Sequence, residues 1–448
     1  MRYIISTLFI LALSAQGADS VQTWFKEGSV KGNIKYYYIQ TDKEKSDGSK
    51  TSAHANAIGG TFNYTTGDLY GFQTGVTFMS TNGFALPDTV DTSILGRDNG
   101  VRLENDPSGK IAQDSFSVLG ELFIKYTYED FSALYGRRVI KTPLLDAKEV
   151  RMLPSAVQGA FLEYKMESGT RFGASYLTHF KQRTSDAFIN IVEHALGANT
   201  RLITGEDEGE VIVVDAVYKS EKTSIKLYDY FADNFMNSVY MEAGFKNRLP
   251  SQWSYAVDAQ YINQRSVGYA DEYLNNTGSQ TGGKQISANA FSLKFGLGYD
   301  ESRLDLAYSE VLKDSDSHDA LVLPWDGTPL FTNMITSNDL FQSNYGNALN
   351  ADSIYIGGSR GIKLNYSQTY DFTGVKGFKT ALSYLNVDND KFIDKQEDFN
   401  AVIAYGTGGL SIALKGILVH NDSSGDKTGT VSQLEKLTQY RVIANYKF

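Results

Sequence analysis

Cysteine is absent from this 448-residue chain, and proline and histidine are scarce, with 7 and 5 residues respectively. Without cysteine there are no disulfides, no thiolate metal sites and no cysteine nucleophiles. Beyond the N-terminus no run of 18 apolar residues occurs, and the mean hydropathy is -0.30. This excludes a membrane protein built from helices, because each spanning helix needs about 20 apolar residues.

The N-terminus has the features of a signal peptide. Arg2 gives a positive start, residues 3–13 are almost all apolar, and Ala15 and Gly17 place small residues where a signal peptidase cleaves. We therefore expect residues 1–17 to be removed on export and residues 18–448 to form a single domain. The alternative for the apolar stretch is a buried N-terminal helix.

The composition of the remainder is rich in aromatic residues, with 29 Tyr and 25 Phe. Tyrosine suits the zone of a membrane where acyl chains meet headgroups. The last nine residues alternate between two faces. One face carries Tyr440, Val442, Ala444, Tyr446 and Phe448, and the other carries Arg441, Ile443, Asn445 and Lys447. An apolar outer face and a polar inner face with period 2 are typical of a transmembrane β-barrel strand.

The same alternation recurs along the chain and predicts an all-β fold, a closed antiparallel barrel of eighteen strands. Each strand has roughly ten residues, which suits a tilted crossing of the bilayer. The strands are expected to start near residues 28, 53, 69, 115, 131, 157, 171, 209, 224, 237, 253, 287, 303, 361, 378, 397, 410 and 438. Sixteen strands remain the alternative, if the weak segments 224–232 and 237–246 are not strands.

The connections between these strands alternate between short and long. The long polar ones lie near residues 80–114, 139–156, 181–207, 264–286, 312–359 and 420–437, and six of the seven prolines fall within them. Short periplasmic turns and long outer loops produce this asymmetry in outer-membrane barrels. Proline cannot donate to a strand ladder, so its positions support the predicted strands.

The third outer loop, near residues 139–156, and the strand ends beside it carry the motifs Gly136-Arg137, Thr142-Pro143-Leu144, Arg151-Met152 with Pro154, and Gly159, and the seventh outer loop carries the segment 324–332, PWDGTPLFT. These motifs resemble those of the OprD family of eighteen-stranded bacterial porins. Two residues depart from the family pattern: Arg138 stands where Gln is usual, and Ser155 replaces Asn after Pro154. Because of these two departures, the side-chain contacts of this loop do not carry over intact. The specific motifs cover only about fifty residues, whereas the leader, the strand count and the C-terminal Phe extend the similarity over the whole chain.

The resemblance implies that the third loop, about residues 139–156, folds inward and constricts a channel for small carboxylated solutes. Its candidate constriction residues are Arg137, Arg138, Lys141 and Arg151. Adjacent residues of a strand face opposite sides, so only one of the two adjacent arginines can face the lumen, and we favour Arg137. Alternatively, these cations anchor the loop to lumen carboxylates.

A basic track follows from alternation alone. Closing the barrel brings the last two strands beside the first, and their polar faces carry Lys31, Lys35, Lys415, Arg441 and Lys447 without any Asp or Glu. Five cations on neighbouring strands would make one wall of the lumen basic. In the alternative arrangement, acidic loops reach in and balance them.

The sequence offers no metal, cofactor or catalytic site. The histidines are scattered, and the Asp-rich segments 314–319 and 388–394 lack the glycine of an EF-hand loop. The net charge of -10 argues against nucleic acid as a partner.

We expect a bacterial outer-membrane porin, not an enzyme, through which small hydrophilic, anionic solutes diffuse. Its other expected partners are outer-membrane lipid and the barrel-assembly machinery, which would recognise Phe448, and a homo-oligomer is left open. The alternatives are a plugged structural or adhesive barrel and an outer-membrane hydrolase.

Overall fold

A computed structural model describes residues 20–84, 94–96, 115–147, 151–276, 281–336, 356–389, 393–422 and 434–448. The expected signal peptide, residues 1–17, lies outside these ranges. So do Pro87 and Pro107, two of the prolines placed in loops from the sequence.

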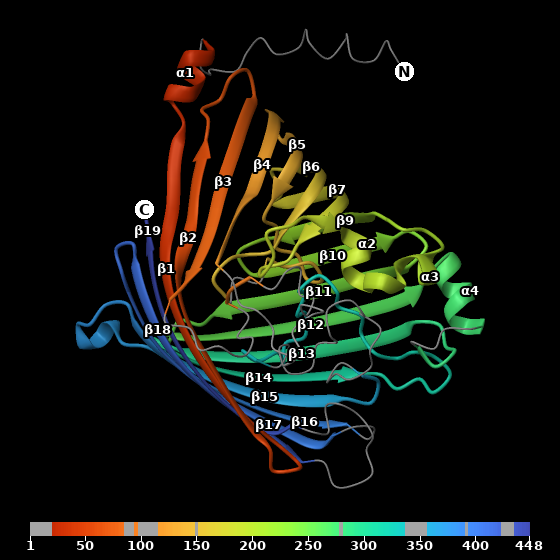
Figure 1. Ribbon diagram of the computed structural model, residues 1–448. Helices are drawn as coiled ribbons and strands as arrows, with labels where there is room; N and C mark the ends of the chain where they lie inside the picture. The colour runs from red at the N-terminus through yellow and green to blue at the C-terminus, as the bar shows by residue number, and fades with distance from the viewer. Residues whose placement is uncertain are drawn as a thin grey trace.

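The described chain is almost entirely β-structure, with a few short helices in the connections (Figure 1). The strands are β1 (Ser29–Lys45), β2 (Lys50–Thr65), β3 (Phe72–Gly83), β4 (Phe116–Tyr128), β5 (Phe131–Arg138), β6 (Ala156–Lys165), β7 (Thr170–Lys181), β8 (Ile189–Asn190), β9 (Val211–Lys219), β10 (Thr223–Ala232), β11 (Met236–Arg248), β12 (Trp253–Ser266), β13 (Ser287–Tyr299), β14 (Ser302–Val311), β15 (Arg360–Thr369), β16 (Phe378–Asn389), β17 (Ile393–Thr407), β18 (Leu410–Asp422) and β19 (Leu434–Lys447). The helices are α1 (Val21–Lys26), α2 (Ile191–Leu196), α3 (Thr200–Thr204), α4 (Tyr269–Asn276) and the 3-10 turns η2 (Gly197–Asn199) and η4 (Asp371–Thr373).

These strands form one closed antiparallel sheet. Each long strand pairs with the next in the chain, and β19 pairs with β1 to close the ring. β8 has two residues and pairs only with the end of β7, so eighteen strands make up the wall. The predicted eighteen-stranded barrel is confirmed, and each long strand begins within four residues of its expected position. Sixteen strands are excluded, because β10 and β11 pair along their whole lengths.

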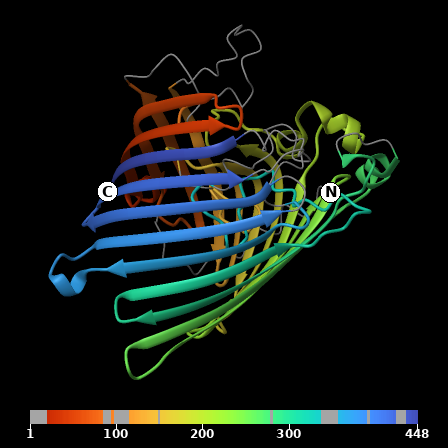
Figure 2. The same ribbon diagram turned by 90° about the horizontal axis from the view of Figure 1, so that it is seen from below.

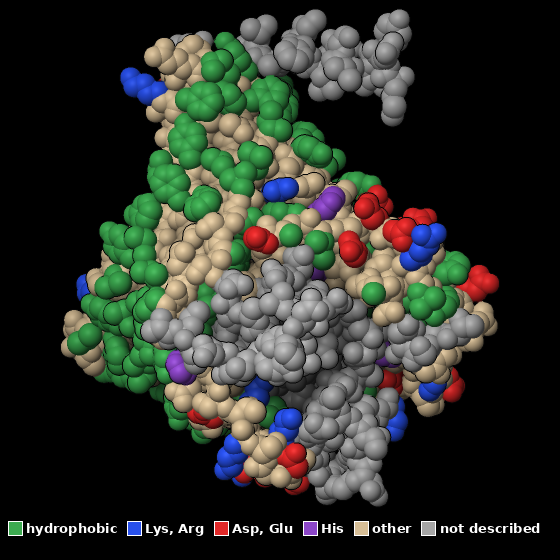
Figure 3. Space-filling view, viewed as in Figure 1, with side chains coloured by type: hydrophobic (Ala, Val, Ile, Leu, Met, Phe, Trp, Pro, Cys, Tyr) green, Lys and Arg blue, Asp and Glu red, His purple; other side chains and the backbone are tan. Residues whose placement is uncertain are grey.

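The alternation that predicted the strands sets the two faces of the wall. On β13 the outward side chains of Leu293 and Phe295 are 52% and 48% exposed, whereas Ser292 of the same strand faces the lumen and is fully buried. The outward face is apolar on strand after strand, and Figure 3 shows hydrophobic side chains covering the outer wall at the left of the view, over β1, β18 and β19. Such a face is stable only against acyl chains.

The two rims of the barrel differ. Short turns such as Glu129–Asp130 and Asp300–Glu301 connect strands at the rim where the chain ends, and Glu129 and Asp300 adopt φ of 49° and 51° there. The backbone of Phe448 exchanges two 3.0 Å hydrogen bonds with Gly32 at this rim. Residue 32 must be glycine beside the Phe448 ring, because a Cβ at this position would lie 2.8 Å from the ring. α2, α3 and α4 belong to long connections at the opposite rim (Figure 2).

None of the helices in the described ranges is both long enough and apolar enough to cross a membrane.

Candidate functional site

The described parts of the third connection, residues 139–147 and 151–155, lie in the lumen, as predicted. Near its start the backbone N–H of Leu144 donates to the hydroxyl of Tyr230 on β10, at 3.3 Å. Near its end the carbonyls of Arg151 and Met152 accept hydrogen bonds from Lys35 Nζ on β1, at 3.0 and 3.2 Å. Since β1 and β10 lie on nearly opposite sides of the closed sheet, the loop crosses the interior.

Three loops fill one side of the lumen with a hydrophobic cluster. Counted along the chain at the outer rim, they are the third connection (between β5 and β6), the fourth (between β7 and β9, with α2) and the seventh (between β14 and β15). Leu144 and Leu145 of the third connection pack with Val192 of α2 and with Trp325 and Leu330 of the seventh connection. The cluster continues onto lumen-facing side chains of β9 to β13. Burial of this apolar surface favours the packed arrangement by roughly 25 cal/mol per Å². The side of the barrel lined by β7 to β13 is therefore closed by loops.

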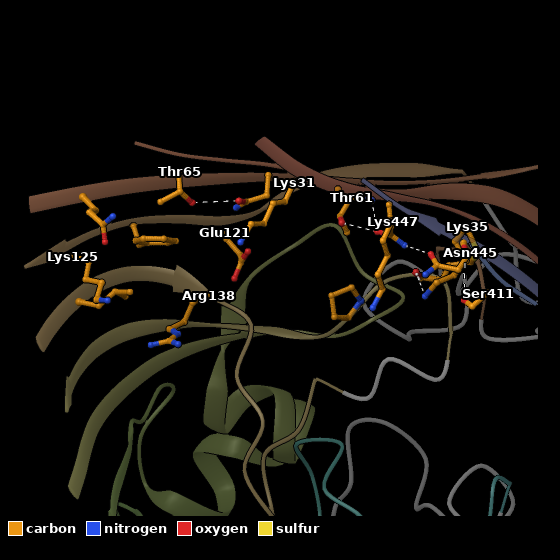
Figure 4. A pocket seen from close by; sticks show the side chains of 18 of the residues that line it. Lys31, Lys35, Thr61, Thr65, Glu121, Lys125, Arg138, Ser411, Asn445 and Lys447 are labelled. Carbon is orange, nitrogen blue, oxygen red and sulfur yellow. Dashed lines mark hydrogen bonds between the residues drawn. The ribbon is translucent and has the colours of Figure 1, made fainter. Parts of the chain in front are cut away.

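A cavity of about 890 Å³ lies on the other side, against β1 to β6, β18 and β19. The end of the third connection forms part of its boundary through Met152 and Pro154. Figure 4 shows Lys31 and Lys447 reaching into this cavity from the β1–β19 side, with Lys125 and Arg138 on the facing side.

The structure brings the predicted basic track together. Lys31, Lys35, Lys415 and Lys447 all line the cavity. Lys447 lies at the level of Asn33, midway between Lys31 and Lys35, and Lys415 pairs across β18–β19 with Arg441 at the level of Ile39. The track therefore extends over eight residues of strand, or about 27 Å at 3.4 Å per residue.

Arg441 differs from the other four members of the track. It is 1% exposed and does not line the cavity. Its guanidinium donates to Gln439 at 2.6 Å and to the hydroxyl of Tyr37 at 3.4 Å. It lies close enough to Lys415 for their charges to interact, so it adds to the positive potential without meeting a solute directly.

Of the two adjacent arginines, Arg138 faces the lumen, and our preference for Arg137 was wrong. Arg138 lines the cavity with its guanidinium 5.1 Å from the centre of the Phe161 ring. Arg137 does not line the cavity: it donates to Gln158 Oε1 at 2.9 Å, and its guanidinium lies 4.3 Å from the centre of the Phe188 ring. The signal was present in the sequence, because the outward-facing Tyr135 places Arg137 on the same face two residues later.

The other two constriction candidates do not line the cavity either. Lys141 is exposed, near the start of the third connection. Arg151 is 3% exposed and lies behind the cavity wall, within range of the charge on Lys415. Its backbone carbonyl, rather than its guanidinium, contacts Lys35.

Three charged residues of the cavity were missed from the sequence: Lys125, Glu121 and Glu163. Glu121 accepts a hydrogen bond from the backbone of Val139, and Glu163 pairs with Lys165 at 3.0 Å and Arg171 at 3.5 Å. Period-2 alternation around the outward residues Leu122, Ile124 and Leu162 would have identified all three.

Much of the remaining wall differs from the wall at the track. Four of its lumen cations have a carboxylate partner: Arg171 with Asp215, Lys226 with Glu242, Lys294 with Asp258, and Arg303 with Asp305. Lys363 on β15 instead donates to the carbonyl of Asn333 at 2.6 Å. In contrast, no carboxylate of the described residues lies within ion-pair distance of Lys31, Lys415 or Lys447. Positive charge is therefore concentrated on one side of the lumen.

The described residues offer no obvious place for a metal ion, since no three of their His, Asp or Glu side chains are grouped to hold one. Asp314 and Asp316, in one of the Asp-rich segments, cap their own loop, with the Asp316 N–H donating to Asp314 at 3.0 Å. Backbone and side-chain hydrogen bonds to Asp316 and Ser317 hold the pKa of Asp314 below its usual value.

Comparisons with solved structures match this architecture. OccK9 (OpdG) of Pseudomonas aeruginosa superposes with a TM-score of 0.74 at 15% identity, over 95% of this chain and 99% of that one. OccAB1 of Acinetobacter baumannii gives 0.72 at 14% identity, over 97% and 99%. OpdK of Pseudomonas aeruginosa, solved with vanillate, gives 0.70 at 13% identity, over 95% and 99%. At these identities the likeness establishes the fold alone.

The comparison with curated protein sequences found no match. The family profile described as "outer membrane porin, OprD family", in contrast, matches residues 22–448, nearly the whole chain. The chain therefore belongs to the OprD family of outer membrane porins, which are channels of the bacterial outer membrane and not enzymes.

Proposed function

We propose that this protein is a passive diffusion channel for small hydrophilic solutes that carry a carboxylate or another negative charge. The observation that carries the proposal is the charge of the cavity. Its lining holds six cationic side chains, Lys31, Lys35, Lys125, Arg138, Lys415 and Lys447, and two carboxylates, Glu121 and Glu163. The formal charge is therefore 6 − 2 = +4 in a protein whose net charge is -10.

A cationic cavity of this kind favours anions for a physical reason. An anion entering a narrow pore loses part of its hydration, and fixed cations replace that stabilisation. Lys31, Lys447 and Lys35 follow one another at successive levels of the wall, two residues or about 7 Å apart. A carboxylate can therefore contact the next ammonium before it leaves the last one. Arg138 on the facing side offers a guanidinium fork, which can hold a carboxylate with two hydrogen bonds.

The filled side of the lumen directs solutes to the track. The loops packed on β9 to β13 occupy the space that a central pore would use, and the described cavity lies against β1, β18 and β19. Water and small polar solutes can enter such a polar cavity, whereas the packed loops exclude them. The route thus runs along the basic wall rather than along the barrel axis.

The ligands of two similar structures agree with this class of solute. OpdK was solved with vanillate and OccK2 (OpdF) in complex with glucuronate, both of which are carboxylates. Their identity to this chain is 13% in each case, so they support the charge of the solute and not its shape.

Planar-bilayer recording tests the proposal. In a potassium chloride gradient the reversal potential should have the sign of anion selectivity, and it should move toward zero as salt increases, because the Debye length falls from about 10 Å at 0.1 M to about 3 Å at 1 M. Addition of benzoate to one side should reduce the chloride current through competition at the lysines. A cation-selective reversal potential would contradict the proposal, and a folded barrel without conductance would favour the plugged structural barrel.

A further inference from the structure

The segment Trp325–Gly327 of the seventh connection contacts both limbs of the third connection. On the first limb, the N–H of Asp146 donates to the carbonyl of Trp325 at 3.1 Å, and Leu145 bridges to the same segment. Gly327 makes the approach possible, because a Cβ there would lie 2.3 Å from the carbonyl oxygen of Leu144. The backbone of the seventh connection is therefore laid directly on the start of the third.

On the second limb the contact is made by the carboxylate of Asp326. Its Oδ2 accepts a hydrogen bond from Ser155 Oγ at 2.6 Å, immediately after Pro154 at the edge of the cavity. Its Oδ1 accepts one from Arg183 Nη1 at 2.8 Å, in the fourth connection. The side chains of Arg183 and Asp326 are 1% and 3% exposed. One buried carboxylate thus joins three loops.

The same segment is also fixed to the fourth connection. Trp325 is 1% exposed, and its indole N–H donates to the carbonyl of Ile191 in α2 at 3.0 Å. Asp326 itself has φ of 62°, a backbone conformation that a non-glycine residue adopts only when its surroundings impose it. The position of the carboxylate is therefore set by the packing of Trp325 on one side and Gly327 on the other.

The charges around the second limb explain why a carboxylate is needed there. Arg151, Lys181 and Arg183 are all buried beside it, and Lys181 Nζ donates to the carbonyls of Pro154 and Gln182. Asp326 acts on the charge of Lys181 as well as pairing with Arg183. Without a nearby anion these three cations would repel one another and move apart, because unpaired charges in a dry interior are costly.

We propose that Asp326 is the positioning residue of the constriction: it holds the second limb of the third connection, at Ser155, against the fourth connection and thereby sets the width of the channel. The proposal rests on the proposed function, that solutes pass through the cavity, and on the expectation from the sequence that the third connection constricts it. It assigns the width to a residue of the seventh connection that does not line the cavity.

Two variants test this role. Ser155→Ala keeps the buried Arg183–Asp326 pair and cuts only the link to the second limb, so it should fold normally. Asp326→Asn removes the charge as well. Asp316→Asn is the matched control, since Asp316 is an exposed carboxylate of the same connection. Folding is checked by the heat-dependent mobility of the barrel on gels.

The readout is the size limit for neutral sugars in liposome swelling, together with single-channel conductance. Neutral sugars are used because their entry does not depend on the anion preference. Conductance should rise about twofold in Asp326→Asn and by a smaller factor in Ser155→Ala, with larger sugars admitted, since passage follows the open cross-section. Asp316→Asn should behave as wild type.

A deletion of residues 142–147 separates the two ideas. If the deletion widens the channel and folded Ser155→Ala does not, the positioning role of Asp326 is wrong while the constriction stands. If the deletion leaves the sugar limit unchanged, the constriction lies elsewhere and both assignments fail. Should Asp326→Asn not fold, the result with Ser155→Ala decides.

Discussion

Replacing Lys31, Lys415 and Lys447 together by Gln should largely abolish the preference for anions. These three side chains line the cavity, and none of the described carboxylates forms an ion pair with them. Lys35 is kept, because it donates to the carbonyls of Arg151 and Met152 and its loss would also move the third connection. The formal charge of the lining would fall from +4 to +1.

The size of the effect follows from Coulomb's law. For a permeating ion about 8 Å from each lysine, one charge contributes about 0.5 kcal/mol in water, which screening at 0.1 M salt reduces to roughly 0.2 kcal/mol. Three charges then contribute about 0.7 kcal/mol, favourable for an anion and unfavourable for a cation. The difference of about 1.4 kcal/mol corresponds to a change of about tenfold in the anion-to-cation permeability ratio.

The assay is the reversal potential in a salt gradient, with conductance and heat-dependent gel mobility recorded for the same preparations. Lys50, Lys376 and Lys436, exposed residues outside the cavity, provide a control triple substitution with the same loss of net charge. The control should keep the wild-type reversal potential. If the lumen triple variant folds and its permeability ratio at 0.1 M salt stays within about twofold of wild type, the basic track does not govern selectivity.

Further outcomes are expected from three other changes. Deleting Thr142–Ala147 should raise single-channel conductance, because these residues bridge the lumen between Tyr230 and the seventh connection; an unchanged conductance in a folded barrel would contradict this. Deleting Phe448 should lower the fraction of folded barrel in membranes by removing two hydrogen bonds to Gly32, worth about 1 kcal/mol each, and pulse-labelled folding assays would measure it. Burial lowers the pKa of His194 to about 4, so the folded state keeps this ring neutral while the unfolded chain binds a proton below about pH 6.5. Stability should therefore be unaffected above pH 6.5 and decrease by about 3 kcal/mol as pH falls to 4, and His194→Gln should reduce this loss in melting experiments. An equal pH dependence in the variant would show that other groups are responsible.

The strands could be predicted because their determinants are local. Leu293, Phe295 and Leu297 alternate with polar neighbours over a few residues, and lipid outside and water inside enforce that pattern directly. The closure of the barrel then followed from the even strand number and the last strand. For the same reason, alternation placed four of the five track residues on the cavity. The preference for Arg137 over Arg138 was wrong because alternation was not counted from the outward-facing Tyr135.

Depth and loop position could not be predicted in this way. Period-2 alternation assigns Arg441 to the lumen face, but only the neighbouring Tyr37 and Gln439 show that it is buried rather than open to solute. The link between Ser155 and Asp326 joins residues 171 positions apart, through contacts of three loops that have no periodic pattern. Such contacts depend on the completed barrel, so short-range signals in the chain do not encode them.

The seam where β1 meets β19 has a consequence for biogenesis. Lys31 and Lys35 belong to the first strand and Arg441 and Lys447 to the last, so they become neighbours only when the sheet closes. Before that step the cations of the first and last strands are apart, so their charge is not yet concentrated on one wall. Mutual repulsion of these side chains also opposes closure, and the continuous backbone pairing from Asn33 with Lys447 to Glu44 with Lys436 must outweigh it. If the basic track governs selectivity as we propose, selectivity arises only when the sheet closes, and the pairing of β19 with β1 must overcome the repulsion between their cations.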